Sequence, residues 1–438
     1  MKKFIFNLKI NLLRKRAATR FKQLCLNEKK SLEELLEEQE TQKKDLVKYA
    51  FEEIPFYKRH YSEVDFELGD MEQEGWFEKL PIITKDHLRN SFEEFTPQDL
   101  KNFRRISTTG GSTGVPTKCG YDGRITEEVY SWRLQSWYGV HPWDDHAYVW
   151  RDTRTTKIAK LKNALLWWPT KHLKLNASFI TEEAIVAFLK DFNCVKPTLL
   201  QGYVGAVCQV AQYVLEHSIQ LHVPKFVWVT SAPISPVQRK LLEDAFHAPV
   251  CDQYGSCEIR WIAQQCPQAN GLHVNIDHVF LEFVDDANIS VPCGNYGKTL
   301  LTNLEDYVFP MIRYENGDRG RWLNQRCSCG CPLPLIDSVK GRESESFVLP
   351  SGRTINGEYL TTIFDENPDI VRGFRVVQHK DLSITVEYVP AYESIEPILR
   401  RIEDNFRRQI NNEVKLLFEP KSEISHDRGK LRFVVREK

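Results

Sequence analysis

The sequence predicts an α/β protein. It has a large N-terminal domain, whose parallel or mixed sheets are flanked by helices, and a small α+β C-terminal domain. Three observations lead to this fold class. Helical and strand patterns alternate between Thr181 and Asp252, which is typical of a parallel sheet with crossover helices. After Arg342 the pattern changes to strand pairs around one helix. A chain of 438 residues also exceeds one ordinary hydrophobic core, which favours two domains.

The first 62 residues are expected to form a helical arm (1–62) that belongs to the large domain. Ser31 and Glu34 have the spacing of a capping box, and helical periodicity follows as far as Glu53, before Pro55 ends it. The main part of the large domain then covers residues 63–341, and the small domain covers residues 342–438.

The alternating region predicts three parallel strands joined by helices. The expected elements are a helix over 181–192, a strand over 198–201, a helix over 203–217, a strand over 226–230, a helix from Ser235 to 246 and a strand over 249–252. Ligands bind beyond the carboxyl ends of such strands. Ser231, Ala232 and Pro233 follow one strand end, and residues 252–258 lie at the next.

The small domain has a different pattern. We expect strands over 374–378 and 383–389, a helix over 396–411, and further strands near Lys415 and Leu431. This order indicates an α+β unit of under a hundred residues.

Composition excludes some classes of function. Lys and Arg number 59 against 60 Asp and Glu, so no global field attracts nucleic acid. Eleven cysteines without a signal peptide indicate thiols or metal ligands in a reducing cytoplasm rather than a disulfide scaffold. We therefore expect a cytoplasmic protein.

The N-terminal segment 1–16 interleaves apolar and basic residues, and its apolar runs are too short to span a bilayer. As a helix it would place Phe4, Leu8, Leu12 and Leu13 near one side, with lysines and arginines elsewhere. That pattern fits a helix packed on the large domain, which we favour, and also a peripheral helix at the inner face of a membrane.

Six tryptophans lie between Trp132 and Trp168. Large apolar side chains are more often part of a core than of a ligand site, and core packing is the first interpretation. The alternative is that Trp167 and Trp168 line an acyl pocket or contact a partner.

The segment 107–118 concentrates phosphate-binding groups, with three glycines, six hydroxyl side chains and Lys118. Glycine lets successive N–H groups approach an anion, while hydroxyls and an ammonium add donors. The spacing between Gly114 and Lys118 is not that of a Walker loop. An ordinary Gly/Ser/Thr loop is the alternative.

Short motifs follow this loop in a fixed order. They are Asp252-Gln-Tyr-Gly-Ser-Cys-Glu258, Tyr314-Glu-Asn-Gly-Asp318, Gly341-Arg342 and Gly429-Lys430. Their order and spacing resemble the adenylate-forming enzymes, which activate carboxylic acids with ATP. The chain is most similar to the phenylacetate–coenzyme A ligase branch and its CapK-like members, associated with capsular polysaccharide biosynthesis. The features that carry this are Glu53-Ile-Pro-Phe-Tyr57, Leu80-Pro-Ile-Ile-Thr-Lys-Asp86, Gly271-Leu-His273 and Cys327-Ser-Cys-Gly330.

The resemblance implies a set of nucleotide-binding residues. Tyr254 and Gly255 would lie against adenine, Glu258 would hold Mg²⁺, and Asp318 and Arg342 would contact the ribose. The triphosphate loop would use Thr108, Gly110, Gly111, Ser112, Thr113, Gly114 and Lys118. Ser231, Ala232, Pro233, Asp252 and Gln253 would complete the site.

Lys430 is the implied catalytic lysine, carried by a small domain that is mobile in this family. Here Glu343-Ser-Glu345 follows Arg342 in place of the usual Arg-x-Asp-Asp, so the hinge departs from the family pattern. Ser256 and Cys257 also replace the more usual residues of the Tyr-Gly-x-x-Glu motif.

The resemblance further implies a structural Zn²⁺ site of Cys266, His273, Cys327 and Cys329. Cys331, where the branch commonly has arginine, is an alternate ligand. A Cys₃His set can hold zinc tetrahedrally. Plain buried thiols are the other interpretation of these residues.

The sequence therefore predicts an AMP-forming acyl-adenylate synthetase that uses ATP and Mg²⁺. Its partners would be a small carboxylic acid and an acceptor, either coenzyme A or an amine or hydroxyl group, in capsule or surface polysaccharide biosynthesis. The alternative is a catalytically silent nucleotide-binding scaffold in a polysaccharide assembly complex. Tyr203 and Val204 are expected to line the acyl pocket, and the sequence identifies neither the acid nor the acceptor.

Overall fold

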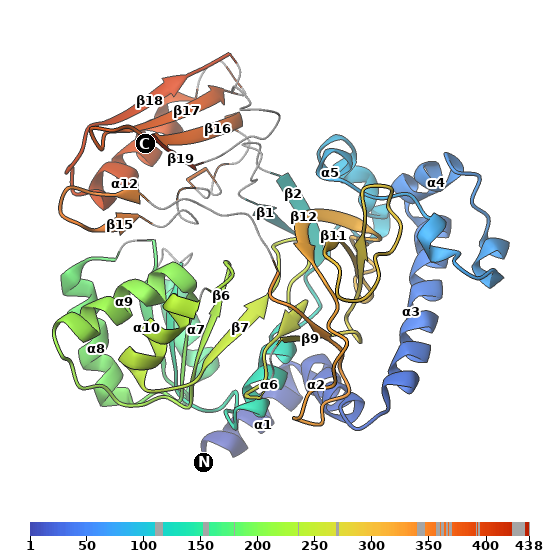
Figure 1. Ribbon diagram of the computed structural model, residues 1–438, viewed down its shortest axis with the longest axis horizontal. Coiled ribbons are helices and arrows are strands. Elements are labelled where there is room, and N and C mark those ends of the chain that lie inside the picture. Colours follow the sequence, from blue (N-terminus) through green and yellow to red (C-terminus); the bar gives the residue numbers. More distant parts are fainter. Residues whose placement is uncertain are drawn as a thin grey trace. The chain divides into compact units, whose positions relative to one another are not determined.

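The computed structural model describes residues 1–109, 117–151, 157–178, 180–234, 236–268, 271–339, 347–355, 360, 363–364, 367, 370–390, 392, 395–422 and 434–437 (Figure 1). The chain divides into two compact units. The first is Met1–Ile106 with Gly120–Gly341, and the second is Ser107–Cys119 with Arg342–Lys438. Each unit is described separately below.

The large unit begins with the predicted helical arm. Its helices are α1 (Lys2–Leu13), α2 (Lys15–Asn27), α3 (Leu32–Glu53) and α4 (Pro55–Ser62). The capping box at the start of α3 is present, because Ser31 Oγ accepts the Glu34 N–H at 3.1 Å and Glu34 Oε2 accepts the Ser31 N–H at 2.7 Å. Such a cap contributes about 1 kcal/mol. Pro55 ends α3 and occupies the first turn of α4, where no N–H is needed.

The arm packs on the body of the large unit. In α1, Ile10 is buried and the Phe6 ring packs edge-on against Trp132 and Trp143, at centroid distances of 5.6 and 5.8 Å. Ala17 and Leu24 of α2 belong to the same cluster. The packed interpretation of the N-terminal segment therefore holds for this side of α1.

Short elements connect the arm to the sheets. They are η1 (Leu68–Glu72), η2 (Phe77–Lys79), α5 (Lys85–Ser91), η3 (Phe92–Phe95), η4 (Gln98–Leu100) and a two-stranded sheet of β1 (Arg104–Thr109) and β2 (Thr117–Asp122).

The main sheet has eight strands in the order β13-β9-β8-β7-β6-β5-β3-β4. Their bounds are β3 (His146–Trp150), β4 (His172–Asn176), β5 (Leu199–Tyr203), β6 (Phe226–Thr230), β7 (Val250–Tyr254), β8 (Ala263–Gln264), β9 (Leu272–Val274) and β13 (Leu335–Ile336). The strands β5, β6 and β7 are parallel, as predicted. The strands β3 and β4, which were not predicted, continue the parallel part, and β8, β9 and β13 extend the sheet antiparallel. The sheet is therefore mixed.

Helices cover both faces of the parallel part. Val210 of α9 and Leu242 of α10 pack with Val227 and Val229 of β6, while Leu134 of α6 packs with the other face of β6. All five β6 residues are consequently buried, which is why this strand has no polar alternation. The helices of this region are α6 (Glu128–Trp137), α7 (Lys157–Trp167), α8 (Glu182–Val195), α9 (Val204–Glu216) and α10 (Pro236–Phe246).

A second, antiparallel sheet has the order β10-β11-β12, with β10 (Val279–Val284), β11 (Gly297–Asn303) and β12 (Tyr314–Gly320). Its apolar residues share a core with the arm, in which Leu301 and Tyr314 pack in one cluster with Leu46 and Tyr57. No helix in the described part of the chain combines the length and the apolar character needed to cross a membrane.

The C-terminal unit contains the predicted α+β elements. Its sheet has the order β18-β17-β16-β19, with β16 (Val371–Gln378), β17 (Ile384–Pro390), β18 (Leu416–Pro420) and β19 (Val434–Arg436), and a smaller pair is formed by β14 (Phe347–Val348) and β15 (Thr354–Ile355). Helix α12 (Glu396–Gln409) buries Leu399, Ile402 and Phe406, which lie on one face by their spacing.

Candidate nucleotide site and cysteine–histidine cluster

Two predicted segments lie side by side at the carboxyl ends of β6 and β7. Thr230 Oγ1, the last residue of β6, lies 2.9 Å from the Gln253 carbonyl oxygen and 2.7 Å from Gln253 Oε1. The Gln253 amide in turn donates to the Tyr254 carbonyl at 2.7 Å. Ser231 follows with φ at 79°, a left-handed conformation that ends the strand abruptly and costs backbone energy. Residues 231–233 and Asp252–Tyr254 thus stand on adjoining strand ends.

Tyr254 joins this edge to the second sheet. Its hydroxyl donates to Asp318 Oδ2 at 2.9 Å, and the Asn316 amide nitrogen lies 2.7 Å from both the Tyr254 hydroxyl and Asp318 Oδ2. Burial raises the pKa of Tyr254 well above its ordinary value, with the Asp318 charge adding to the effect, so the phenol remains a donor. The triangle fixes the tyrosine ring and the Asp318 carboxylate relative to each other.

Glu258 is oriented by a residue of β12, the strand that also carries Asn316 and Asp318. The hydroxyl of the fully buried Tyr314 donates to Glu258 Oε1 at 2.8 Å. Tyr314, Asn316 and Asp318 all belong to β12, where alternate residues share a face. We call Tyr254, Glu258, Tyr314, Asn316 and Asp318 the polar cluster.

Asp252, two residues before Tyr254 in β7, is buried. Burial raises the pKa of its carboxyl to about 6, against a lowering effect of the Arg239 charge. Gly255 is tightly surrounded, since a Cβ there would lie 2.9 Å from the Gln253 amide nitrogen and 3.0 Å from the Trp261 amide. A side chain at residue 255 would displace one of these groups.

The remaining predicted nucleotide residues are only partly described. Thr108 lies in β1 and Lys118 in β2, on either side of residues 110–116. Gly110, Gly111, Ser112, Thr113, Gly114, Arg342 and Lys430 lie outside the described residues.

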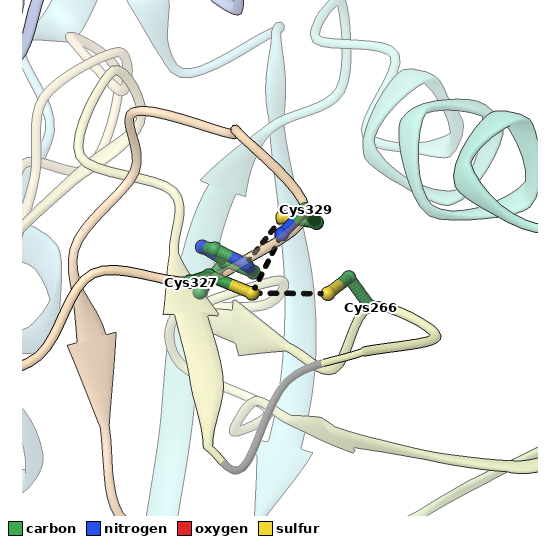
Figure 2. Close-up of side chains that lie close together, drawn as sticks. Cys266, Cys327 and Cys329 are labelled. Carbon is green, nitrogen blue, oxygen red and sulfur yellow. Dashed lines mark hydrogen bonds between the residues drawn. The ribbon is translucent and has the colours of Figure 1, made fainter.

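At the antiparallel edge of the main sheet, Cys266, His273, Cys327 and Cys329 converge. Their ligand atoms all lie within 4.8 Å of one another. Figure 2 shows the three cysteine side chains directed toward one another, with Cys266 Sγ 3.6 Å from Cys327 Sγ. Cys329 Sγ lies 3.4 Å from His273 Nε2. Around a tetrahedral zinc ion two sulfur ligands are separated by about 3.8 Å and a sulfur and a nitrogen ligand by about 3.5 Å, so the observed 3.6 and 3.4 Å are close to the spacings of such a site.

The surroundings of this cysteine–histidine cluster orient its atoms. His273 Nδ1 donates to the Leu333 carbonyl at 2.7 Å, because that oxygen can only accept, and Nε2 is left with its lone pair toward Cys329. Burial lowers the pKa of His273, which favours the neutral ring. Backbone amides of Cys329 and Cys331 donate to Cys327 Sγ and Cys329 Sγ at 3.5 and 3.4 Å. Such donors stabilise thiolates.

The alternate ligand, Cys331, does not join the cluster. Among the described residues the converging set contains four ligand atoms, and the Cys331 side chain instead packs against the apolar core of the arm and second sheet. Gly330, at φ 80°, makes the turn that separates it from Cys329.

Sequence reasoning missed two members of the polar cluster, Tyr314 as the partner of Glu258 and Asn316. Their spacing from Asp318 was a usable signal, because residues i, i+2 and i+4 of a strand share a face. Of the predicted pocket wall, Tyr203 packs against the Trp150 ring at 4.2 Å, but Val204 is buried in the helix–sheet core.

The Trp-rich region has no single role. Trp132 is buried, whereas Trp168 is 58 % exposed beside α1. Trp137 donates to Glu28 at 2.8 Å and packs edge-on against His273, with centroids 5.5 Å apart. Core packing therefore explains Trp132, and Trp168 is discussed below.

No family model matches the chain. Among curated proteins it is 25 % identical to CapK of Staphylococcus aureus over 247 residues, which cover 55 % of this chain and 53 % of CapK. It is 22 % identical to phenylacetate–coenzyme A ligase of Thermus thermophilus over 376 residues, covering 83 % of this chain and 82 % of that enzyme. The ligase of Escherichia coli is 23 % identical over 339 residues. The CapK match thus spans about half of that protein.

Solved structures share the fold. The open form of 2-hydroxyisobutyryl-CoA ligase, in complex with 2-HIB-AMP and CoA, superposes with a TM-score of 0.60 at 19 % identity, covering 91 % of both chains. The thioesterification state of the same enzyme gives a TM-score of 0.61 and covers 92 % of this chain and 89 % of that one. The chain therefore has the fold of this ligase, and over most of its length it is similar in sequence to phenylacetate–coenzyme A ligases.

Proposed function

We propose that this protein activates a small carboxylic acid with ATP, releasing pyrophosphate and forming an acyl adenylate. A carboxylate oxygen would bond to the α-phosphorus of ATP as the bond from that phosphorus to the bridging oxygen of pyrophosphate breaks. The polar cluster, standing at the strand ends of an adenylate-forming fold, is the observation that carries this proposal. Catalysis of this kind needs held orientation and charge neutralisation more than covalent chemistry.

The roles follow from the chemistry of each side chain. Tyr254 offers a fixed ring on which adenine can stack, and Asp318 offers a carboxylate for the ribose hydroxyls. Glu258 supplies the oxygen ligand that Mg²⁺ prefers, in an orientation set by Tyr314. Lys118 and residues 108–114 would bind the triphosphate, Arg342 the ribose, and Lys430 the reacting carboxylate and α-phosphate.

The acceptor is proposed from the relatives. Phenylacetate–coenzyme A ligases among them support coenzyme A, which would form a thioester and release AMP. The CapK match supports a role in capsule or surface polysaccharide biosynthesis, in which an amine or hydroxyl group would take the acyl group instead. In either case we place the protein in the cytoplasm, with residues 342–438 as a mobile domain beyond the large domain.

We also propose that the cysteine–histidine cluster holds one structural Zn²⁺. The fit of the spacings to a tetrahedral ion, the bond that leaves His273 Nε2 available, and the N–H···S contacts support this. The four residues would cross-link strand β9 and the β8–β9 connection to the loop before β13.

The test is acid-dependent exchange of labelled pyrophosphate into ATP, with Mg²⁺, across a panel of aryl, fatty and amino acids. Exchange that is lost in Glu258→Gln and Lys430→Ala, and retained in Glu315→Gln, is the expected result. Glu315 is the matched control because it lies on β12 beside the polar cluster and alternates to the other face. ATP binding by calorimetry without exchange for any acid would favour the catalytically silent scaffold.

A further inference from the structure

Helix α1 carries apolar side chains on two opposite sides. Phe6 and Ile10 pack against the large unit. Phe4, Leu8 and Leu12, spaced by four residues, lie on another side and are between 51 % and 72 % exposed. A surface helix of a globular protein normally presents polar residues on its outer side, as α12 does. The outer side of α1 therefore lacks the polar residues that a solvent-facing side of a helix normally carries.

A second helix repeats this pattern next to α1. In α7, Ile158, Leu161 and Leu165 share one side by their spacing and are between 62 % and 68 % exposed. The two helices are joined by Lys9 of α1, whose ammonium donates to the carbonyls of Leu165 and Trp168 at the end of α7, at 3.1 and 2.6 Å. Exposed Leu13, Leu166 and Trp168 border one shared recess. We call the exposed apolar side chains of these two adjoining helices, together with Leu13, Leu166 and Trp168, the α1–α7 surface.

The two segments that carry this surface contain only basic charged residues. Residues 1–27 contain eight lysines and arginines, residues 157–176 contain five lysines, and neither segment contains an aspartate or glutamate. Several of these cations are paired with carboxylates of neighbouring segments, among them Lys2 with Asp145 at 2.6 Å, Arg14 with Glu128 at 3.2 Å and Arg20 with Glu305 at 2.6 Å. Lys15 and Arg16 are exposed in the first turn of α2, directly after α1 ends. In a chain whose net charge is −1, this concentration is strongly local.

We propose that the α1–α7 surface docks on a membrane that contains anionic phospholipid. An interfacial helix inserts its apolar side at the headgroup boundary while flanking cations attract anionic lipid, and an exposed tryptophan is suited to that depth. The surface offers both components, from two helices rather than one.

A second copy of this chain fits the surface less well. In a symmetric dimer the same patch faces itself, so the cations of one copy would meet those of the other. Like charges in contact without acidic partners oppose association. A bilayer surface of negative charge satisfies both the cations and the apolar side chains.

The experiment is co-sedimentation of the full-length protein with phosphatidylcholine vesicles that either lack or contain phosphatidylglycerol. We expect sedimentation with the mixed vesicles only. Each cation near the surface contributes about fivefold to partitioning, so Lys15→Gln with Arg16→Gln should weaken binding by about 25-fold. The matched control is Lys48→Gln with Lys58→Gln, two exposed lysines on α3 and α4.

The apolar component is tested separately on each helix. Leu8→Gln with Leu12→Gln, and Leu161→Gln with Leu165→Gln, should each lower the partition coefficient by about tenfold or more, because burial of apolar area drives insertion. Ile289→Gln is the control, since Ile289 is 65 % exposed in the β10–β11 connection. Thermal midpoints identical to wild type would show that the variants fold.

Three outcomes would overturn the proposal. The first is absence of sedimentation with either vesicle, and the second is equal binding to neutral and anionic vesicles at low and high salt. The third is a dimer, seen by sedimentation velocity without lipid, that Leu8→Gln with Leu12→Gln dissociates, which would make the surface an interface between copies. None of these readouts depends on adenylation.

Discussion

The polar cluster and the cysteine–histidine cluster both include residues of the main sheet or its connections, but they are assembled in different ways. Three of the five residues of the polar cluster come from β12, and their common face follows from strand alternation. The cysteine–histidine cluster takes residues from three separate segments. These segments meet because His273 of β9 pairs with Gln264 of β8 on one side and with Leu335 of β13 on the other. The first arrangement is local in sequence, whereas the second depends on the register of three short strands.

This difference suggests a division of roles. The polar cluster is half open and rich in donors and acceptors, as a site that exchanges substrates must be. The histidine and one cysteine of the other cluster are almost completely buried, which suits a cross-link. Variants should therefore separate turnover from stability.

Among the variants that test this comparison, the largest effect is expected at Asp318. Asp318→Asn keeps the shape but removes the charge that would accept from the ribose, and exchange activity should fall by about 100-fold. The thermal midpoint should change little. Glu315→Gln is again the control, and full activity of Asp318→Asn would remove the assigned role.

The cysteine–histidine cluster should show the opposite behaviour. Cys329→Ser removes one of four ligands, so the expected results are loss of one equivalent of zinc per chain and a thermal midpoint lower by about 5 °C. Elemental analysis and calorimetry measure both. The exposed Cys194→Ser should change neither, and a metal-free wild type with the same midpoint would contradict the zinc proposal.

Asp252 tests how burial of a carboxyl group in β7 affects the stability of the fold. Its pKa is about 6 in the folded protein, against an ordinary value of 3.8, so between these pH values the folded chain binds a proton that the unfolded chain has lost. The free energy of unfolding therefore falls as pH rises through this window.

Asp252→Asn should remove this dependence. The stability of the variant relative to wild type should then be greater at pH ~8 than at pH ~4, by up to about 2 kcal/mol. Denaturant titration at both pH values provides the measurement. A difference of the opposite sign would show that Asp252 is stabilised as an anion.

The smallest effect is expected at Tyr314. Tyr314→Phe removes the donor that orients Glu258, which is worth about 1 kcal/mol, or about fivefold in exchange activity. The Mg²⁺ concentration for half-maximal exchange should rise. Tyr296→Phe removes a comparable bond to Asp337, of 2.8 Å, from another part of the large unit and should leave exchange unchanged.

Much of the fold was predictable because its signals are local. The capping box at Ser31 is present, and the strand expected over 226–230 matches β6 residue for residue. The antiparallel extension by β8, β9 and β13 was not predicted, because strands of two or three residues carry no readable periodicity. The Leu333 carbonyl that orients His273 has no signature in side-chain identity.

The candidate site shows the same limit. Motif order placed Tyr254, Glu258 and Asp318 in the sequence, but their mutual contacts needed β7 and β12 to be brought together. The assignments to residues 110–114, Arg342 and Lys430 stay predictions.

The helical arm has a consequence for any binding event at α1. Asp277 accepts the Asn27 amide of α2 at 2.8 Å and both Nη atoms of fully buried Arg133 in α6, at 3.0 and 2.5 Å, and Arg20 of α2 pairs with Glu305 at 2.6 Å. Breaking a buried pair of this kind costs several kcal/mol. The helical arm is therefore fixed to the large unit and is not a flexible linker. A surface bound by α1 would therefore fix the orientation of the whole large unit, including the strand ends that carry Tyr254, relative to that surface.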